Sequence, residues 1–125
     1  MEGYNRLSPR EAAGKFIQNR FRNCQGALLA GSVIRGEATK TTNLDIVIFD
    51  CNIQAAYRES IIDLGWNIEI FVHNLTSYKD FLASDCESAR PSFPRMVVEG
   101  EVIIDKGIIT SIKNEAKEWN RTKEK

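Results

Sequence analysis

The sequence predicts an α+β fold in which a small mixed β-sheet carries helices mainly on one face. Short apolar runs at 26–30, 44–49, 66–73 and 101–105 have the length of β-strands. Stretches at 9–22 and 108–119 instead repeat their apolar residues at helical spacing. With 125 residues, of which 42% are hydrophobic, the chain suits a single domain over 1–125 with a substantial core.

Charge and cysteine content narrow the class of protein. The 17 basic and 17 acidic residues cancel, so no overall field favours nucleic acid or an anionic membrane as a partner. No apolar run is long enough to cross a bilayer and the first residues lack a signal-peptide pattern, so we expect a cytoplasmic protein. Cys24, Cys51 and Cys86 are odd in number and widely spaced, which favours reduced, partly buried thiols over disulfides or a zinc site.

The first helix has a clear start. Ser8 can cap it, Pro9 suits the first helical position, and Glu11 completes a capping box. The apolar side chains that fall on one face of this helix are Ala12, Ala13, Phe16, Ile17 and Phe21. The pattern predicts a helix that packs on the core.

The middle of the chain is expected to supply three strands. Gly26–Ala30 is a continuous apolar run, which is typical of a strand covered on both faces. Leu44–Phe49 is the second strand and Trp66–His73 is the third. Between these two, the apolar pattern over 52–64 suggests a loop and a helix that is stopped by Gly65.

The last third of the chain begins with a helix that opens at Thr76. Its apolar residues Phe81 and Leu82 are expected to point inward. The prolines at 91 and 94 indicate a turn over 91–94, and 101–105 reads as a short strand.

A final helix carries an apolar stripe made of Ile108, Ile109, Ile112, Ala116 and Trp119. Trp119 belongs either to the core or to a contact with a second subunit, as in a homodimer, or with a missing helical domain. The basic tail over 120–125 is expected to fray.

Two carboxylates, Asp45 and Glu69, lie inside otherwise apolar strands. A chain keeps an ionised carboxylate there only when a cation, a hydrogen-bond network or a solvent-filled cleft compensates it. Side chains two apart share a face, so Asn43 lies with Asp45. If the two strands are neighbours, the carboxylates meet, and two hard oxygen ligands plus substrate phosphates are what Mg²⁺ usually takes. We therefore expect Asp45 and Glu69 to hold the ion at the open edge of the sheet, with Asn43 on the same face.

Each acid also has a simpler interpretation. Asp45 could be a surface residue on a half-exposed strand, and Glu69 could belong to an ordinary polar edge with Asn67 and His73. His73 is the single histidine, and its place near a strand end favours a structural role.

Gly31 and Ser32 follow the first strand and suggest the phosphate half of the same site. Glycine lets the backbone approach a phosphate, and the Ser32 hydroxyl can donate to it. Arg35 lies about one helical turn later and can add a charge-assisted contact. A Gly-Ser pair alone is usually only a turn, so its spacing from the acidic strands decides the interpretation.

The stretch 30–36 followed by 42–48 resembles the signature of the polymerase β-like nucleotidyltransferase superfamily. That signature is Gly-Ser, a variable loop, Asp-x-Asp on a strand, and a third acid on the next strand. The residues that match it, or match an Arg-Gly pair of the small bacterial branch, are Gly31, Ser32, Arg35, Gly36, Asp45 and Glu69. The first two match the phosphate-binding pair, and the last two match the second and third acids.

The resemblance implies transfer of a nucleoside monophosphate from a nucleoside triphosphate, with ATP expected, to an acceptor hydroxyl on a small molecule or a protein. It makes Asp45 and Glu69 the metal ligand and base. Asn43 departs from the signature because it replaces the first Asp. The resemblance makes it a weakened metal ligand, since its carbonyl oxygen can still bind a metal but carries no charge. Two alternatives follow: a catalytically degenerate nucleotide-binding protein, or a minimal antitoxin that modifies a partner protein.

Overall fold

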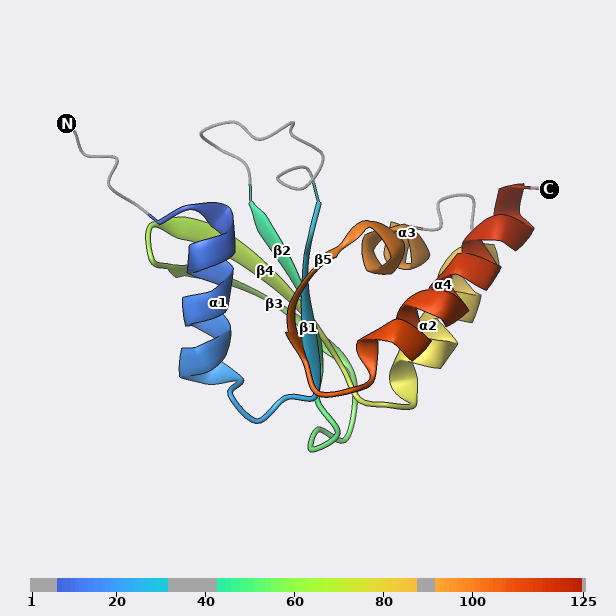
Figure 1. The fold of residues 1–125 in the computed structure, drawn as a ribbon, viewed down its shortest axis with the longest axis horizontal. Helices are drawn as coiled ribbons and strands as arrows, with labels where there is room; N and C mark the ends of the chain where they lie inside the picture. The colour runs from blue at the N-terminus through green and yellow to red at the C-terminus, as the bar shows by residue number, and fades with distance from the viewer. Residues whose placement is uncertain (1–6, 32–42, 88–91, 125) are drawn as a thin grey trace.

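The computed structural model describes residues 7–31, 43–87 and 92–124, and within them one five-stranded sheet and four helices (Figure 1). The strands are β1 (Gly26–Ala30), β2 (Leu44–Phe49), β3 (Tyr57–Asp63), β4 (Trp66–His73) and β5 (Glu101–Asp105). The helices are α1 (Pro9–Arg20), α2 (Ser77–Glu87), α3 (Ser92–Glu99) and α4 (Ile109–Glu124). The strand order is β3-β4-β2-β1-β5, with β2 and β4 parallel and the other pairs antiparallel. The predicted α+β class with a mixed sheet is confirmed.

Helix α1 begins as the sequence predicts. The Ser8 hydroxyl accepts a hydrogen bond from the backbone N–H of Glu11 at 3.3 Å, and the Glu11 carboxylate accepts one from the backbone N–H of Ser8 at 3.4 Å. These two bonds satisfy donors that the helix itself leaves without partners. The indole Nε1 of Trp66 donates to the carbonyl of Leu7 at 2.9 Å, which ties the start of α1 to β4.

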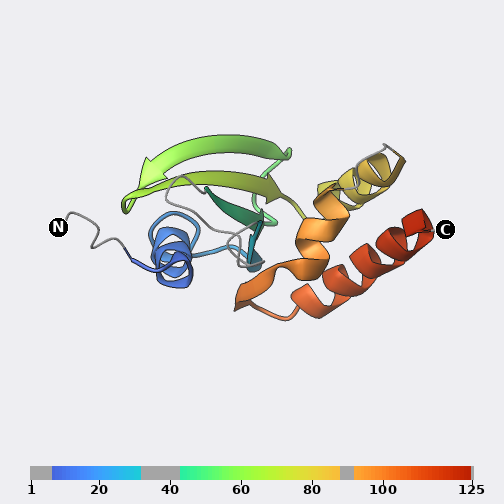
Figure 2. The same ribbon diagram turned by 90° about the horizontal axis from the view of Figure 1, so that it is seen from above.

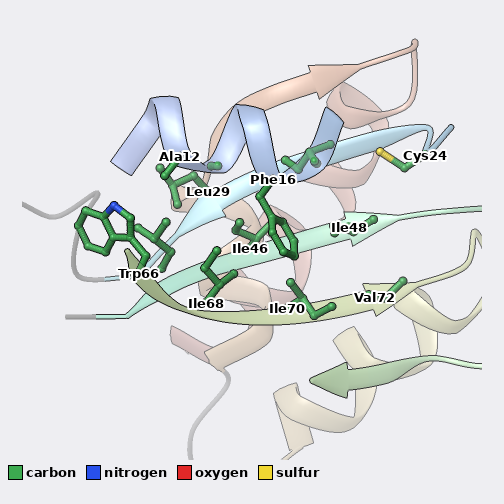
Figure 3. Close-up of a cluster of buried hydrophobic side chains, with 14 residues drawn as sticks. Ala12, Phe16, Cys24, Leu29, Ile46, Ile48, Trp66, Ile68, Ile70 and Val72 are labelled. Atoms are coloured by element: carbon green, nitrogen blue, oxygen red, sulfur yellow. The ribbon is translucent and has the colours of Figure 1, made fainter. Parts of the chain in front are cut away.

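The alternation of side chains along the central strands divides the core in two. The face under α1 is covered by a cluster of small and aliphatic residues with two aromatic ones (Figure 3): Ala12, Ala13, Phe16, Ile17, Cys24, Ala27, Leu29, Leu44, Ile46, Ile48, Trp66, Ile68, Ile70 and Val72. The opposite face joins α2, α3 and α4 through Leu28, Val47, Phe49, Tyr78, Leu82, Val97, Ile109, Ile112 and Ala116. Three helices thus pack on one face, as predicted, and α1 alone covers the other (Figure 2).

The expectation of a loop and helix over 52–64 is wrong, because Tyr57–Asp63 forms strand β3 at the edge of the sheet. Its side chains are mostly exposed, so it lacks the apolar alternation that marks a strand with one buried face. Pairing with β4 stabilises it instead, through a two-residue turn at Leu64 and Gly65. Both turn residues have positive φ, 55° and 80°, as in the type I′ turn that matches the twist of a β-hairpin.

The proline turn expected over 91–94 is replaced in part by helix α3, which begins at Ser92. Pro94 lies in its first turn, where a missing N–H costs no helical hydrogen bond. Lys113 of α4 stabilises the other end: its ammonium donates to the carbonyls of Val97, Val98 and Gly100 at 2.9, 3.0 and 2.7 Å. Burial lowers the pKa of Lys113. This end cap comes from a distant part of the chain, so no local pattern could reveal it.

Three smaller expectations need correction. Phe81 is 46% exposed rather than inward, although Leu82 is buried. Cys51 is exposed, whereas Cys24 is the buried free thiol that we expected. Helix α4 runs to Glu124 and so includes most of the tail that we expected to fray, since Arg, Lys and Glu are good helix formers. The side chains of Trp119 and Cys86 lie outside the described residues.

Candidate functional site

The two strand carboxylates meet on the sheet. Strands β2 and β4 are parallel neighbours, and Asp45 is paired with Glu69 in their register. Residues paired in this way point to the same face, so the carboxylates lie side by side, and both side chains are half-buried. The expected open edge is wrong, because β2 is the central strand and the pair lies near the start of β2 and β4.

Gly31 lies directly against one of these carboxylates. It follows β1, whose last residue, Ala30, pairs with Asp45. A Cβ at Gly31 would collide with the carboxylate oxygen Oδ2 of Asp45, and it would lie 3.1 Å from Cγ. The φ of +88° is also one that L residues rarely adopt. Glycine is therefore required here both by the backbone conformation and by the close approach of Asp45.

Glu69 is held by two hydrogen-bond donors. The guanidinium Nη2 of Arg58 is 2.7 Å from Glu69 Oε1. The side-chain amide of Asn43 donates to Oε2 of the same carboxylate at 3.5 Å. Asn43 therefore directs its amide group, a donor, at Glu69, where a metal ligand would have to direct an oxygen.

Arg58 is the residue of this site that the sequence did not predict. It lies on β3, opposite Phe71 in the strand register, and its guanidinium carbon is 4.9 Å from the centre of the Phe71 ring. A cation in this position is attracted by the face of the ring. The turn at Leu64 and Gly65 was the one signal that could have placed Tyr57–Asp63 in the sheet, and so brought Arg58 beside Glu69.

A shallow hollow of about 370 Å³ adjoins Glu69 on the β3 side. Its lining residues are Asn43, Ser60, Ile61, Ile62, Asn67, Ile68 and Glu69. Amide and hydroxyl groups line it together with the exposed side chain of Ile62, which is 80% exposed. The hollow could receive an uncharged polar group next to Glu69.

His73 lies on the same strand as Glu69 but does not belong to the site. It is buried, its Nδ1 is 3.4 Å from the hydroxyl of Ser77, and its ring meets Phe81 edge to face at 4.6 Å. Burial lowers its pKa from 6.5 to about 4, so the imidazole is neutral at pH 7. This environment fits the structural role that we expected.

The site offers two carboxylates as ligands for a Mg²⁺ ion. Among the described residues there is no group of three or more Asp, Glu, His or Cys side chains that could hold a metal. Mg²⁺ nevertheless often takes only one or two carboxylates and fills its shell with water and substrate phosphates. Asp45 and Glu69, side by side next to the backbone of Gly31, meet that need. The predicted phosphate contacts of Ser32 and Arg35 lie outside the described residues.

Comparison with known proteins bears on the fold. No protein-family model and no curated protein matches this chain. Among solved structures, it is similar to a nucleotidyltransferase-like protein from Exiguobacterium sibiricum, with a TM-score of 0.64 and 12% sequence identity. The match covers 91% of this chain and 40% of that one, so this chain spans about two fifths of its length. The likeness confirms the expected nucleotidyltransferase-like α+β fold.

No helix within the described ranges has the length and apolarity that a membrane span requires.

Proposed function

We propose that this protein is a nucleotidyltransferase that transfers a nucleoside monophosphate from a nucleoside triphosphate, ATP being the first to test, to an acceptor hydroxyl. The observation that carries the proposal is the in-register pair of Asp45 and Glu69 beside Gly31. Two ionised carboxylates side by side repel each other, and a nearby cation relieves that repulsion. The spacing of Gly31 from the two acids, which resembles the superfamily signature, and the shared fold both support the same activity.

In the proposed reaction the acceptor oxygen forms a bond to the α-phosphorus. The bond between that phosphorus and the bridging oxygen breaks, and pyrophosphate leaves with the electron pair. Glu69 takes the proton of the acceptor hydroxyl, and Asp45 with Glu69 would hold Mg²⁺ together with the phosphates. When bound, Mg²⁺ neutralises phosphate charge and lowers the pKa of the attacking hydroxyl. Gly31 lets the backbone at the end of β1 approach the Asp45 carboxylate closely, and we expect the phosphates to bind beside it, with Ser32 and Arg35 as further contacts.

The test is incubation with α-labelled ATP, Mg²⁺ and a panel of small-molecule and protein acceptors. We expect label on an acceptor with the wild type and none with Asp45→Ala. We also expect Asp45→Ala to weaken Mg²⁺-dependent nucleotide binding by about a hundredfold in calorimetry. Thermal stability should stay similar or rise, since a repelling charge is removed. Unchanged affinity in Asp45→Ala would contradict the site assignment.

A second candidate function is nucleotide binding without turnover. It is favoured by the contact in which Asn43 directs its amide at Glu69, because an amide cannot supply the charge that the signature places there. Asn43→Asp should then raise Mg²⁺ affinity and turn a binding protein into one that releases pyrophosphate. Equal or weaker metal binding in this variant would mean that residue 43 does not face the ion.

A further inference from the structure

We propose that Arg58 is an internal counter-cation: it holds Glu69 in the absence of a metal ion and competes with the ion for that carboxylate. The inference rests on the proposed function, because it assumes that Glu69 is a metal ligand. It assigns to Arg58, a residue outside the family signature, control over how readily the site accepts a divalent cation.

Glu69 already accepts hydrogen bonds from two N–H donors. Arg58 approaches Oε1 and Asn43 approaches Oε2, so each oxygen of this carboxylate already has an N–H donor. A carboxylate oxygen that bonds a guanidinium is less available to a second cation, and the two positive charges repel each other at short range. Each oxygen keeps a second lone pair, but a divalent ion that binds Glu69 meets the positive charge of Arg58 until the guanidinium moves away.

Arg58 and Glu69 differ in their exposure to solvent. The Arg58 side chain is 64% exposed, whereas that of Glu69 is 23% exposed. Arg58 can therefore leave for solvent with its charge hydrated, while Glu69 stays at the sheet surface, where it needs a cation. The Phe71 ring holds Arg58 near the carboxylate when no ion is present. The pair is built so that the arginine is the exchangeable member.

The chain offers a closely matched control in Arg20. Its Nε is 3.6 Å from Oδ2 of Asp63, its guanidinium carbon is 5.5 Å from the centre of the Phe16 ring, and its side chain is 50% exposed. Arg20 thus pairs with a strand carboxylate and lies over an aromatic ring, as Arg58 does. The paired carboxylate, Asp63, is not part of the site.

The test is a calorimetric titration in which Mn²⁺ is added to the nucleotide-free protein. We expect Arg58→Gln to bind Mn²⁺ roughly fivefold to tenfold more tightly than the wild type, since one charged hydrogen bond no longer competes. Arg20→Gln should remain within about twofold of the wild type. Arg58→Lys, which keeps the charge but loses the planar fork, should lie between the wild type and Arg58→Gln. Thermal melts establish that each variant is folded.

A double-mutant cycle with Glu69→Gln separates competition from a general field effect. If Arg58 acts by occupying Glu69, Arg58→Gln gains no Mn²⁺ affinity in the Glu69→Gln background. An equal gain in both backgrounds would show a long-range charge effect and overturn the inference. Weaker binding in Arg58→Gln would also overturn it, because Arg58 would then be positioning Glu69 for the ion.

Failure of this inference and failure of the proposed function give different results. A wild type that transfers label, with no gain of affinity in Arg58→Gln, overturns the role of Arg58 alone. A gain in Arg58→Gln that is lost with Glu69→Gln, in a protein that transfers no label to any acceptor, supports the role of Arg58 and contradicts the transferase activity. If no variant binds Mn²⁺ and the wild type transfers no label, both are overturned.

Discussion

The two faces of strand β4 differ sharply although their residues alternate along one short segment. Ile68 and Ile70 are buried among aliphatic side chains under α1 (Figure 3). Asn67 is exposed and Glu69 is half-buried on the opposite face. The same division separates Ile46 from Asp45 on β2. The period of two along a strand lets one segment serve the core with one set of side chains and the candidate site with the other.

The face of the sheet that carries Asp45 and Glu69, here called the polar face, is itself divided along the length of its strands. Toward the end of β2, Val47 and Phe49 are covered by α2, α3 and α4. Toward its start, Glu69 lines the neighbouring hollow, and Asp45 is the partner of Glu69 in the strand register. The helices therefore stabilise one half of this face and leave the other half accessible. Substitutions on the two faces and in the two halves should therefore have different effects, and the largest effect on stability is expected in the core.

Removing a side chain from the aliphatic face should have the largest effect on stability. We expect Ile70→Ala to lower the free energy of unfolding by about 3 kcal/mol, because it leaves a cavity in a packed core. Glu69→Gln, one residue away on the other face, should change it by less than about 1 kcal/mol, because its ion pair with Arg58 is partly exposed. Urea denaturation measures both. Equal losses would contradict the division of the strand into a core face and a site face.

Acid should destabilise the protein through His73, which lies on the covered half of the polar face. Its pKa is about 4 when folded against an ordinary value of 6.5, so between these pH values the unfolded chain binds the proton first. Stability is therefore fully present above pH 6.5 and falls as the pH drops toward 4, by on the order of 3 kcal/mol. Urea melts across this range measure the slope.

The control for this pH effect is His73→Gln, which has no titratable group at the position. We expect the variant to be less stable at pH 7 but to lose less stability between pH 6.5 and 4 than the wild type does. If the two proteins showed the same slope, the acid sensitivity would come from another group.

The helical cover depends on Lys113 as a cap for α3. Lys113→Met should cost about 2 kcal/mol, because three backbone carbonyls lose a charged donor while the apolar stem is kept. The matched control is Lys117→Met on the same helix, whose exposed side chain should be nearly neutral for stability. Thermal unfolding compares the two, and a similar shift in both would contradict the capping role.

The smallest effect on stability is expected at Gly31, but it should be accompanied by a large effect on binding. Gly31→Ala should cost about 1 kcal/mol from its positive φ, and the added methyl group should displace the Asp45 carboxylate. Gly14→Ala is the control, because nothing lies within 4 Å of a Cβ at this helical position and alanine should stabilise the helix by up to about 1 kcal/mol. Differential scanning calorimetry and nucleotide titration measure both variants. Normal nucleotide binding by Gly31→Ala would separate this glycine from the site.

The sequence reveals much of the fold where local patterns are strong. The capped helix at Ser8 and the buried strands β1, β2 and β4 follow from capping chemistry and apolar runs. Strand β3 and helix α3 escape because an exposed edge strand has little apolar alternation and two prolines resemble a turn. Both elements depend on contacts outside their own segments, because β3 pairs with β4 across a two-residue turn and Lys113 of α4 caps α3.

For the candidate site, the residues with suitable chemistry can be identified from the sequence. They are a glycine after a strand and two acids in apolar strands, where a buried carboxylate needs a cation or hydrogen-bond donors. The tertiary structure alone decided that Asp45 and Glu69 are in register on parallel neighbours, and that Arg58 pairs with Glu69. The alternation of side chains along a strand and their burial follow from the local sequence, whereas strand order and register depend on pairing between segments that are far apart in the chain.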